Sequence, residues 1–104
     1  MDYRYKNDEI YVMKEDNSYL IHTTFPLYED GVVNIDHTFV APELRGTGEA
    51  SKMMVAALEH IKSMGLQVVA TCPYAVVWLK RHKEYDDMIR HDLMEHMNEA
   101  CKII

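Results

Sequence analysis

The sequence predicts a small mixed α/β (α+β) domain in which helices pack on a sheet made of an antiparallel meander and one parallel crossover strand. Three observations lead to this prediction. Strand-like segments fill the first 40 residues, a helix-period segment follows a glycine-containing loop, and a short apolar segment comes directly after that helix. Because 104 residues is the usual size of one domain, we expect residues 1–104 to form a single domain.

The meander is predicted from three segments. Segments 9–14 and 18–25 are rich in β-branched and aromatic residues, and Asp16-Asn17 between them is typical of a hairpin turn. Segment 32–40 then alternates in polarity, as a strand with one buried face does. Its predicted inner face consists of Val33, Ile35, His37 and Phe39.

Segment 49–64 has a period near 3.6 residues, which predicts an amphipathic helix of about four turns. Gly65 stands where a helix would end. The apolar segment 66–71 then favours a buried strand that pairs in parallel after the helical crossover. The apolar helix positions are Ala50, Met53, Met54, Ala57, Leu58, Ile61 and Met64.

Two further helices are predicted near the C-terminus. A short one covers 75–81 after Pro73, and a longer one covers about 86–101. The apolar stripe of the longer helix can pack on its own sheet or on a partner, and we expect a monomer. That stripe consists of Ile89, Leu93, Met97, Ala100 and Ile104.

Composition excludes several functional classes. With 48% hydrophobic and 27% charged residues the chain can form a core, and its net charge of −6 argues against nucleic acid or an anionic membrane as a partner. We expect no membrane span and no signal peptide, because the sequence lacks the apolar segments that these need. Cys72 and Cys101 are therefore expected to be free thiols in the cytoplasm.

A metal site is not expected from the histidines of the last helix. His91, His96 and Cys101 are spaced five residues apart. Each step of five rotates about 140° around a helix, so the three side chains would not converge.

The loop between Val40 and Lys52 is the most informative motif. Gly46 and Gly48 allow positive φ and close approach of a ligand, and the helix that follows presents free N–H groups and the positive end of its dipole. This combination suits a pyrophosphate, with Arg45 and Lys52 adding charge on either side. Glu49 is discordant, since an acid repels phosphate, and a helix start without a ligand explains the loop equally well.

Cys72 follows the predicted parallel strand, at the sheet edge where ligands bind in open α/β sheets. A thiol there can act as a nucleophile, or it can be a small buried core residue. His37, on the predicted neighbouring strand, can take a proton from an amine or from Cys72, or it can be a core histidine with satisfied hydrogen bonds.

The helix over 75–81 carries two more candidate groups. Lys80, Arg81 and His82 form a basic cluster that can hold a second phosphate or cap the helix C-terminus. Tyr74 and Trp78 lie four residues apart on one face, a spacing more typical of core packing than of a ligand platform.

A resemblance enters at these residues. The run Arg45-Gly46-Thr47-Gly48-Glu49-Ala50 matches the acyl-CoA signature of the GNAT N-acetyltransferase superfamily. More closely, IDHTFVAPELRGTGEASKMM followed by TCPYAVVWLKRHKEY resembles the minimal GNAT-like proteins of roughly one hundred residues. The resemblance covers about residues 8–88, which form the expected core of the domain.

The resemblance implies a shortened GNAT fold in which strands 32–40 and 66–71 splay apart around the pantetheine arm of acetyl-CoA. Loop amides would hold the pyrophosphate, Cys72 would be the catalytic residue, and no metal is implied. His37 is our candidate for the general base. The expected coenzyme contacts are Phe39, Val40, Arg45, Gly46, Thr47, Gly48, Glu49, Ala50, Ser51, Lys52, Tyr74, Arg81 and His82.

The leading hypothesis is therefore N-acetyl transfer from acetyl-CoA to an amine acceptor, either a small molecule or a peptide, with or without an acetyl group carried on Cys72. A coenzyme A-binding or protein-interaction module with little catalysis is the alternative. A Cys/His hydrolase is a third interpretation, disfavoured because no third residue that would orient the histidine is visible.

Overall fold

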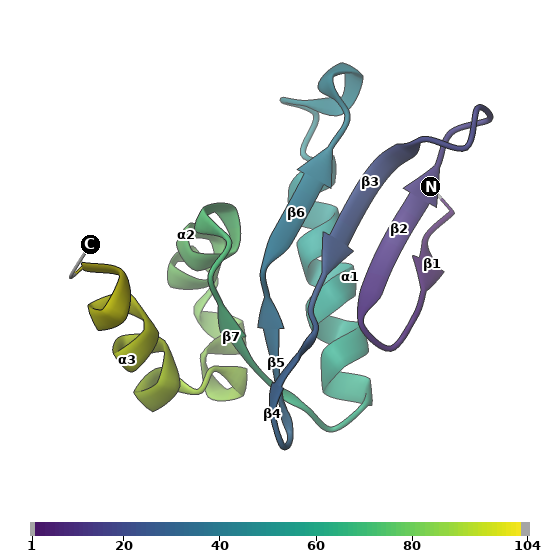
Figure 1. Cartoon of the computed structure of the whole chain (residues 1–104). Coiled ribbons are helices and arrows are strands. Elements are labelled where there is room, and N and C mark those ends of the chain that lie inside the picture. The colour runs from purple at the N-terminus through teal and green to yellow at the C-terminus, as the bar shows by residue number, and fades with distance from the viewer. Residues whose placement is uncertain (1, 103–104) are drawn as a thin grey trace.

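The computed structural model describes residues 2–102, with side chains as far as His96. Two small sheets diverge from a common base, and the helices pack around them (Figure 1). In chain order the elements are β1 (Arg4–Tyr5), β2 (Glu9–Met13), β3 (Tyr19–Thr24), β4 (Leu27–Glu29), β5 (Val32–Ile35), β6 (His37–Val40), η1 (Pro42–Leu44), α1 (Glu49–Ser63), β7 (Gln67–Ala70), α2 (Pro73–Arg81), η2 (Lys83–Met88) and α3 (His91–Lys102). The predicted mixed class, an antiparallel sheet plus one parallel strand pair, is confirmed.

The N-terminal sheet has the strand order β1-β2-β3-β6 and is antiparallel throughout. The predicted hairpin between β2 and β3 is confirmed, and its turn includes Asn17 at a φ of 68°. Inward positions such as Ile10 and Ile21 are buried, whereas their neighbours Tyr11 and His22 are only partly buried. This alternation arises because α1 covers one face of the sheet and no described helix covers the other (Figure 1).

The predicted single strand 32–40 is wrong in one respect, because it is broken at Asp36. The Asp36 side chain accepts a hydrogen bond from the Thr24 hydroxyl, and its N–H donates to the Thr24 carbonyl at 3.3 Å. The break gives β5 to one sheet and β6 to the other. The predicted common face is therefore also wrong: Ile35 is buried, whereas His37 is exposed.

The C-terminal sheet has the order β4-β5-β7, in which β5 and β7 pair in parallel, as the helical crossover predicted. Consecutive residues of both strands are buried, among them Val68 and Val69. Such uninterrupted burial is typical of a parallel pair covered on both faces. The sequence did not predict strands β4 and β1, which are three and two residues long.

Helix α1 follows its prediction closely. Its buried residues are Met53, Met54, Ala57, Leu58 and Ile61. Gly65 has a φ of 73° just after the helix, as expected of a residue that terminates it. The apolar period therefore identified both the helix and the face that packs on the sheets.

The predicted C-terminal helix begins later than expected. Residues 83–88 form the 3₁₀ helix η2, and α3 starts only at His91. Between them Ile89 forms a bridge with Val68, and the Arg90 N–H donates to the Val68 carbonyl at 3.0 Å. This tertiary pairing holds 89–90 extended. The side chains of Met97, Ala100 and Ile104, which were predicted for the apolar stripe, lie outside the described residues.

Helix α2 begins at Pro73, two residues before its predicted start, with proline in the first turn, where its missing N–H costs nothing. Within the described part of the chain, no helix has the length and apolarity needed to cross a membrane.

Candidate functional site

The site lies where β6 separates from β7. The last backbone hydrogen bonds at this fork go to the Ile35 carbonyl and are donated by the N–H groups of Thr71 and Cys72, at 3.1 Å each. Beyond them, β3 is the only described strand that pairs with β6. The N–H of Ala41 points toward β3, since it donates to Leu20 at 2.8 Å.

The direction of the Ala41 N–H fixes the other amides of β6. Neighbouring N–H groups of a strand point in opposite directions, so those of Val40 and Thr38 point away from β3 and into the fork. The fork thus presents backbone hydrogen-bonding groups that a bound chain can pair with.

The glycine loop leads directly into α1. Gly46 and Gly48 have φ values of 82° and 85°, the left-handed conformation that glycine adopts without strain. Gly48 is the N-cap residue, and no side chain caps the helix. The first-turn amides are therefore available to an anion at the positive end of the helix dipole.

The fork and the loop enclose a pocket of about 240 Å³, which we call the fork pocket. It is lined by Thr38, Phe39, Val40, Arg45, Ala50 and Tyr74. All of these except Thr38 were predicted from the sequence as coenzyme contacts, and they come from β6, the loop, α1 and α2. Thr38 was missed because only its neighbour in the strand, His37, carries an obviously reactive group.

Each of three charged residues around the loop, Arg45, Glu49 and Lys52, has a polar partner. Arg45 is exposed, and its Nε donates to the Val40 carbonyl at 3.4 Å. Lys52 Nζ lies 3.4 Å from Glu49 Oε1. The Glu49 carboxylate, discordant in the sequence, is therefore partly neutralised by a lysine one turn later.

Cys72 lies at the base of the fork and is 8% exposed. Its Sγ is 3.1 Å from the Thr38 hydroxyl, so the two groups share a hydrogen bond. The predicted pairing of Cys72 with His37 is wrong, because neighbouring strand residues point to opposite faces and Thr38 faces the thiol. The His37 ring lies instead beside His22, with the ring centroids 5.7 Å apart. This geometry removes the Cys/His dyad that a hydrolase would need.

Comparison with known proteins identifies the family. The family model for the GCN5-related N-acetyl-transferase matches residues 4–88. The chain belongs to the GCN5-related N-acetyltransferase family. The match contains the glycine loop, the fork and Cys72, so the family region coincides with the site built above.

Solved structures agree with this assignment. The chain is similar to the NMR structure of a GCN5-like candidate N-acetyltransferase from Staphylococcus aureus, with a TM-score of 0.71, 28% identity, and coverage of 85% of this chain and 86% of that one. It also matches the crystal structure of Tetrahymena GCN5 with a TM-score of 0.57 and 12% identity, over 70% of this chain and 48% of that one. The second likeness supports the fold alone.

In this GCN5-related chain, Tyr74 and Trp78 have different surroundings. Trp78 is 4% exposed, and its Nε1 donates to the Ser51 hydroxyl at 2.9 Å. Tyr74 is 39% exposed and lines the fork pocket. Burial raises the pKa of the Tyr74 phenol, with a smaller contribution from Cys72. The phenol is thus protonated at neutral pH and can donate a hydrogen bond.

The basic cluster at the C-terminal end of α2 is only partly free for a ligand. The His82 ring stacks on Trp78 at 3.6 Å between centroids, and its Nδ1 lies 2.8 Å from the Trp78 carbonyl. His82 therefore caps α2, which is the second of the two roles considered for it. Arg81 is exposed but does not line the fork pocket.

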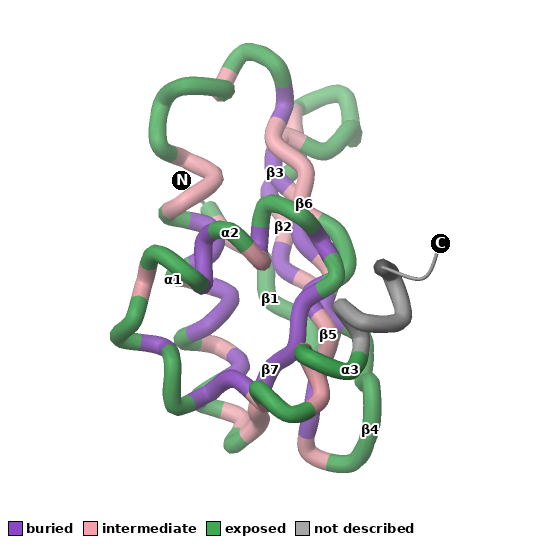
Figure 2. The backbone as a smooth tube through the Cα atoms, turned by 90° about the vertical axis from the view of Figure 1, so that its left-hand side faces the viewer, coloured by how far each residue is buried: buried purple, intermediate pink, exposed green. Residues whose placement is uncertain are grey.

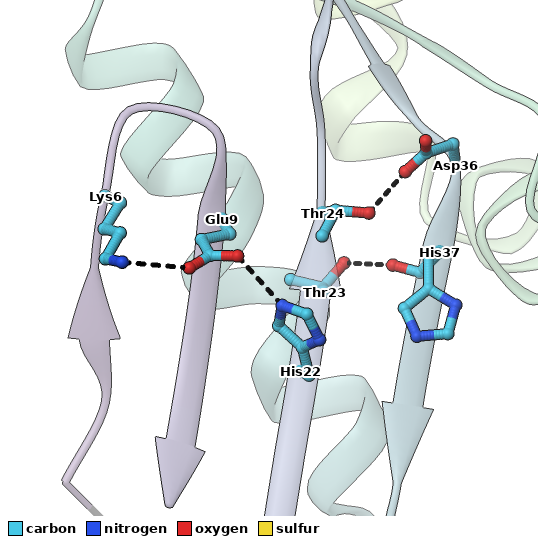
Figure 3. Close-up of polar contacts among 7 residues, drawn as sticks. All are labelled: Lys6, Glu9, His22, Thr23, Thr24, Asp36 and His37. Atoms are coloured by element: carbon cyan, nitrogen blue, oxygen red, sulfur yellow. Dashed lines mark hydrogen bonds and ion pairs between the residues drawn. The ribbon is translucent and has the colours of Figure 1, made fainter. Parts of the chain in front are cut away.

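The outer face of the N-terminal sheet brings His37 together with two side chains that the sequence did not identify, Glu9 and His22. Glu9, His22 and His37 extend from the strands on this face, as Figure 3 shows. Glu9 and His37 both pair with Thr24 and so lie in one row across the sheet, and His22 lies in the next row on the same face. Alternation along β2 and β3 marks Glu9 and His22 as outward-facing, whereas the alternation of segment 32–40 predicted an inward-facing His37. Only the strand register brings the three together. Among the side chains that the structure describes, no three His, Cys, Asp or Glu groups converge as metal ligands.

Proposed function

We propose that the protein transfers the acetyl group of acetyl-CoA to a primary amine. The observation that carries the proposal is that three features meet at the fork: the free edge of β6, the uncapped N-terminus of α1, and the Cys72 thiol, which contacts Thr38 in the wall of the fork pocket. Membership of the N-acetyltransferase family supports the same reaction class.

The proposed coenzyme position follows from the chemistry of each part of the pocket. The amides that follow Gly46 and Gly48 hold the pyrophosphate, and Arg45 and Lys52 supply positive charge beside it. The pantetheine arm runs along β6, where its amide groups pair with the backbone of Thr38 and Val40. Phe39 and Tyr74 form the walls, and the thioester reaches the base of the fork near Cys72.

The transfer itself needs three groups. The nitrogen of a neutral amine attacks the thioester carbonyl carbon, and a backbone N–H of β6 stabilises the negative charge that forms on the oxygen. The carbon–sulfur bond then breaks, and the Tyr74 phenol donates a hydrogen bond or its proton to the departing coenzyme A thiolate. His37 takes the proton that the acceptor amine loses.

Cys72 offers two routes for the acetyl group. In the covalent route its sulfur receives the acetyl group and then passes it to the amine. In the direct route its hydrogen bond with Thr38 only positions the thioester. Mass spectrometry of the protein after a single-turnover exposure to acetyl-CoA distinguishes the routes, because only the covalent route adds an acetyl group to Cys72.

Coenzyme binding is tested by alanine substitutions at glycines that share one conformation. Gly46, Gly48, Gly31 and Gly65 all have positive φ, and a Cβ at any of them would meet no atom within 4 Å. The backbone strain of Gly→Ala is therefore similar at all four positions. We expect Gly46→Ala and Gly48→Ala to weaken coenzyme A binding by about tenfold or more in titration calorimetry, because the added methyl group occupies space the pyrophosphate needs.

Gly31→Ala and Gly65→Ala are the matched controls, since they lie in the β4–β5 turn and after α1. They should lower stability without changing coenzyme affinity. Equal affinity in all four variants would refute the proposed site. If the protein binds coenzyme A but acetylates no amine in a broad panel, it is a coenzyme A-binding module and not an enzyme.

A further inference from the structure

The outer face of the N-terminal sheet holds an ordered carboxylate–imidazole pair (Figure 3). Glu9 Oε2 lies 3.0 Å from His22 Nε2, and Glu9 Oε1 lies 3.4 Å from Lys6 Nζ. Tyr19 stacks on the His22 ring, with centroids 4.0 Å apart and planes 5° from parallel. These contacts hold the imidazole from one edge and one face.

Ionisation sets the direction of the hydrogen bond. The hydrogen bond from His22 lowers the pKa of the Glu9 carboxyl, against the effect of partial burial, and Lys6 lowers it further. A carboxylate only accepts hydrogen bonds, so His22 Nε2 carries the hydrogen. In the neutral ring His22 Nδ1 is then a hydrogen-bond acceptor. Glu9 thus selects the tautomer whose free nitrogen can receive an N–H group.

This imidazole faces a hollow of about 440 Å³, which we call the outer pocket. It is lined by Ser18, Tyr19, His22, His37 and Phe39. Phe39 also lines the fork pocket, so the two pockets adjoin at this residue. The outer pocket has aromatic faces, two imidazoles and a nearby carboxylate, and no Lys or Arg is among its lining residues.

We infer that the outer pocket is the acceptor site and that it selects a primary alkylammonium group, an inference that rests on the proposed function. His22 Nδ1 accepts a hydrogen bond from the ammonium, and Tyr19 and Phe39 line the pocket beside its alkyl chain. Glu9 is a positioning residue, because it acts through His22. Carboxylate-bearing acceptors are disfavoured by the Glu9 charge.

Deprotonation follows from the position of His37. One ammonium N–H bond breaks, its proton goes through the His37 imidazole to water, and the nitrogen keeps the electron pair that forms the new bond to the acetyl carbon. His37 then takes the second proton, which the nitrogen loses as the amide forms and the coenzyme A thiolate leaves. His37 is exposed, so the resulting imidazolium can lose its proton to water. The two pockets therefore supply the two substrates from either side of Phe39.

The inference is tested by NMR titration of the histidine side-chain signals in the full-length protein, with and without coenzyme A. The probe is n-butylamine at a pH where it is protonated, and butyrate is the anionic counterpart. Saturable shifts of His22 and His37 with n-butylamine alone are expected. His91 is the internal reference, because it pairs with Asp86 at 3.2 Å and does not line the outer pocket. A parallel titration with N-α-acetyl-lysine amide distinguishes a free alkylamine from a lysine side chain as the source of the ammonium.

Two variants separate positioning from general effects. Glu9→Gln should weaken n-butylamine binding, or raise its KM, by about tenfold, the size expected for a lost charge-assisted contact, while coenzyme A affinity stays unchanged. Asp86→Asn removes the same kind of partner from His91 and should change neither value. If His22 and His37 do not respond to n-butylamine although coenzyme A binds, the acceptor site is refuted and the proposed function stands. If coenzyme A does not bind to the loop of the unmodified protein, the proposed function is refuted, whatever the histidines do.

Discussion

The two sheets of this protein differ in how many of their faces are covered. In the N-terminal sheet buried and partly exposed residues alternate, as at Ile10 and Tyr11. In the C-terminal sheet consecutive residues such as Val68 and Val69 are both buried. Figure 2 shows α1 and α2 to one side of β5 and β7, and the first turn of α3 to the other.

We infer from this difference in coverage that one sheet contributes mainly to stability and the other mainly to the chemistry. The two-sided sheet gives a packed base on which Cys72 is held at the fork, whereas the one-sided sheet leaves uncovered the face on which we propose the acceptor site. Both sheets are needed because the fork exists only where the chain passes from β5 in the two-sided sheet to β6 in the one-sided sheet.

The largest effects are expected from alanine substitutions that compare the sheet covered on both faces with the sheet covered on one face. Val68→Ala and Val69→Ala should each lower the free energy of unfolding by about 2 kcal/mol, because both side chains are removed from packed surroundings. On β2, Ile10→Ala should cost about 3 kcal/mol, but Tyr11→Ala only about 1 kcal/mol or less. Chemical denaturation of the four variants measures this. A neutral effect at Val68 or Val69 would show that one face of β7 is not packed.

The second prediction concerns the base of the fork. Thr38→Val keeps the shape of the side chain but removes the hydroxyl next to the Cys72 thiol. Because a donated hydrogen bond stabilises the thiolate, we expect alkylation of Cys72 and acetyl transfer to slow by about tenfold. Thr71→Val is the matched control, since this hydroxyl bonds to Asn34 at 3.1 Å and not to sulfur. Equal alkylation rates in both variants would contradict a role for Thr38.

The third prediction separates structure from binding at Ser51, which the sequence assigned to coenzyme contacts. Its hydroxyl accepts the Trp78 Nε1 hydrogen bond. Ser51→Ala leaves this buried donor without a partner, so we expect a loss of about 1–2 kcal/mol in stability with coenzyme affinity unchanged. Thermal unfolding and calorimetry with coenzyme A measure the two quantities. If Ser51→Ala lowers coenzyme A affinity without lowering stability, Ser51 is a coenzyme contact and the prediction is wrong.

The smallest expected effect is a dependence on pH in the one-sided sheet. The folded pKa of Glu9 lies below its ordinary value of 4.5, so Glu9 stabilises the folded state above that pH, and this contribution is lost as the pH falls through the folded pKa. Glu9→Gln should therefore lower stability by about 1 kcal/mol or less at pH 7 and by a smaller amount near pH 3. Melting temperatures at both pH values test this, and a larger loss in acid would contradict the sign.

Local pattern was enough for much of the site. The 3.6-residue period predicted α1 and its buried face, because one helix face must pack on the sheets. Gly46 and Gly48 predicted positive φ values at the start of α1, and the apolar segment before Cys72 predicted the buried strand β7. Each of these features depends on residues close together in the chain.

The rest was decided by contacts between distant residues. The break at Asp36 depends on Thr24, and the start of α3 depends on the bond between Arg90 and Val68. The contact of Cys72 with Thr38 and not with His37 depends on the direction in which β6 leaves β7 after the break at Asp36. Polarity patterns specify which faces are buried, but register and strand divergence are set by the packing of the whole chain, so only the tertiary structure could show which side chains meet.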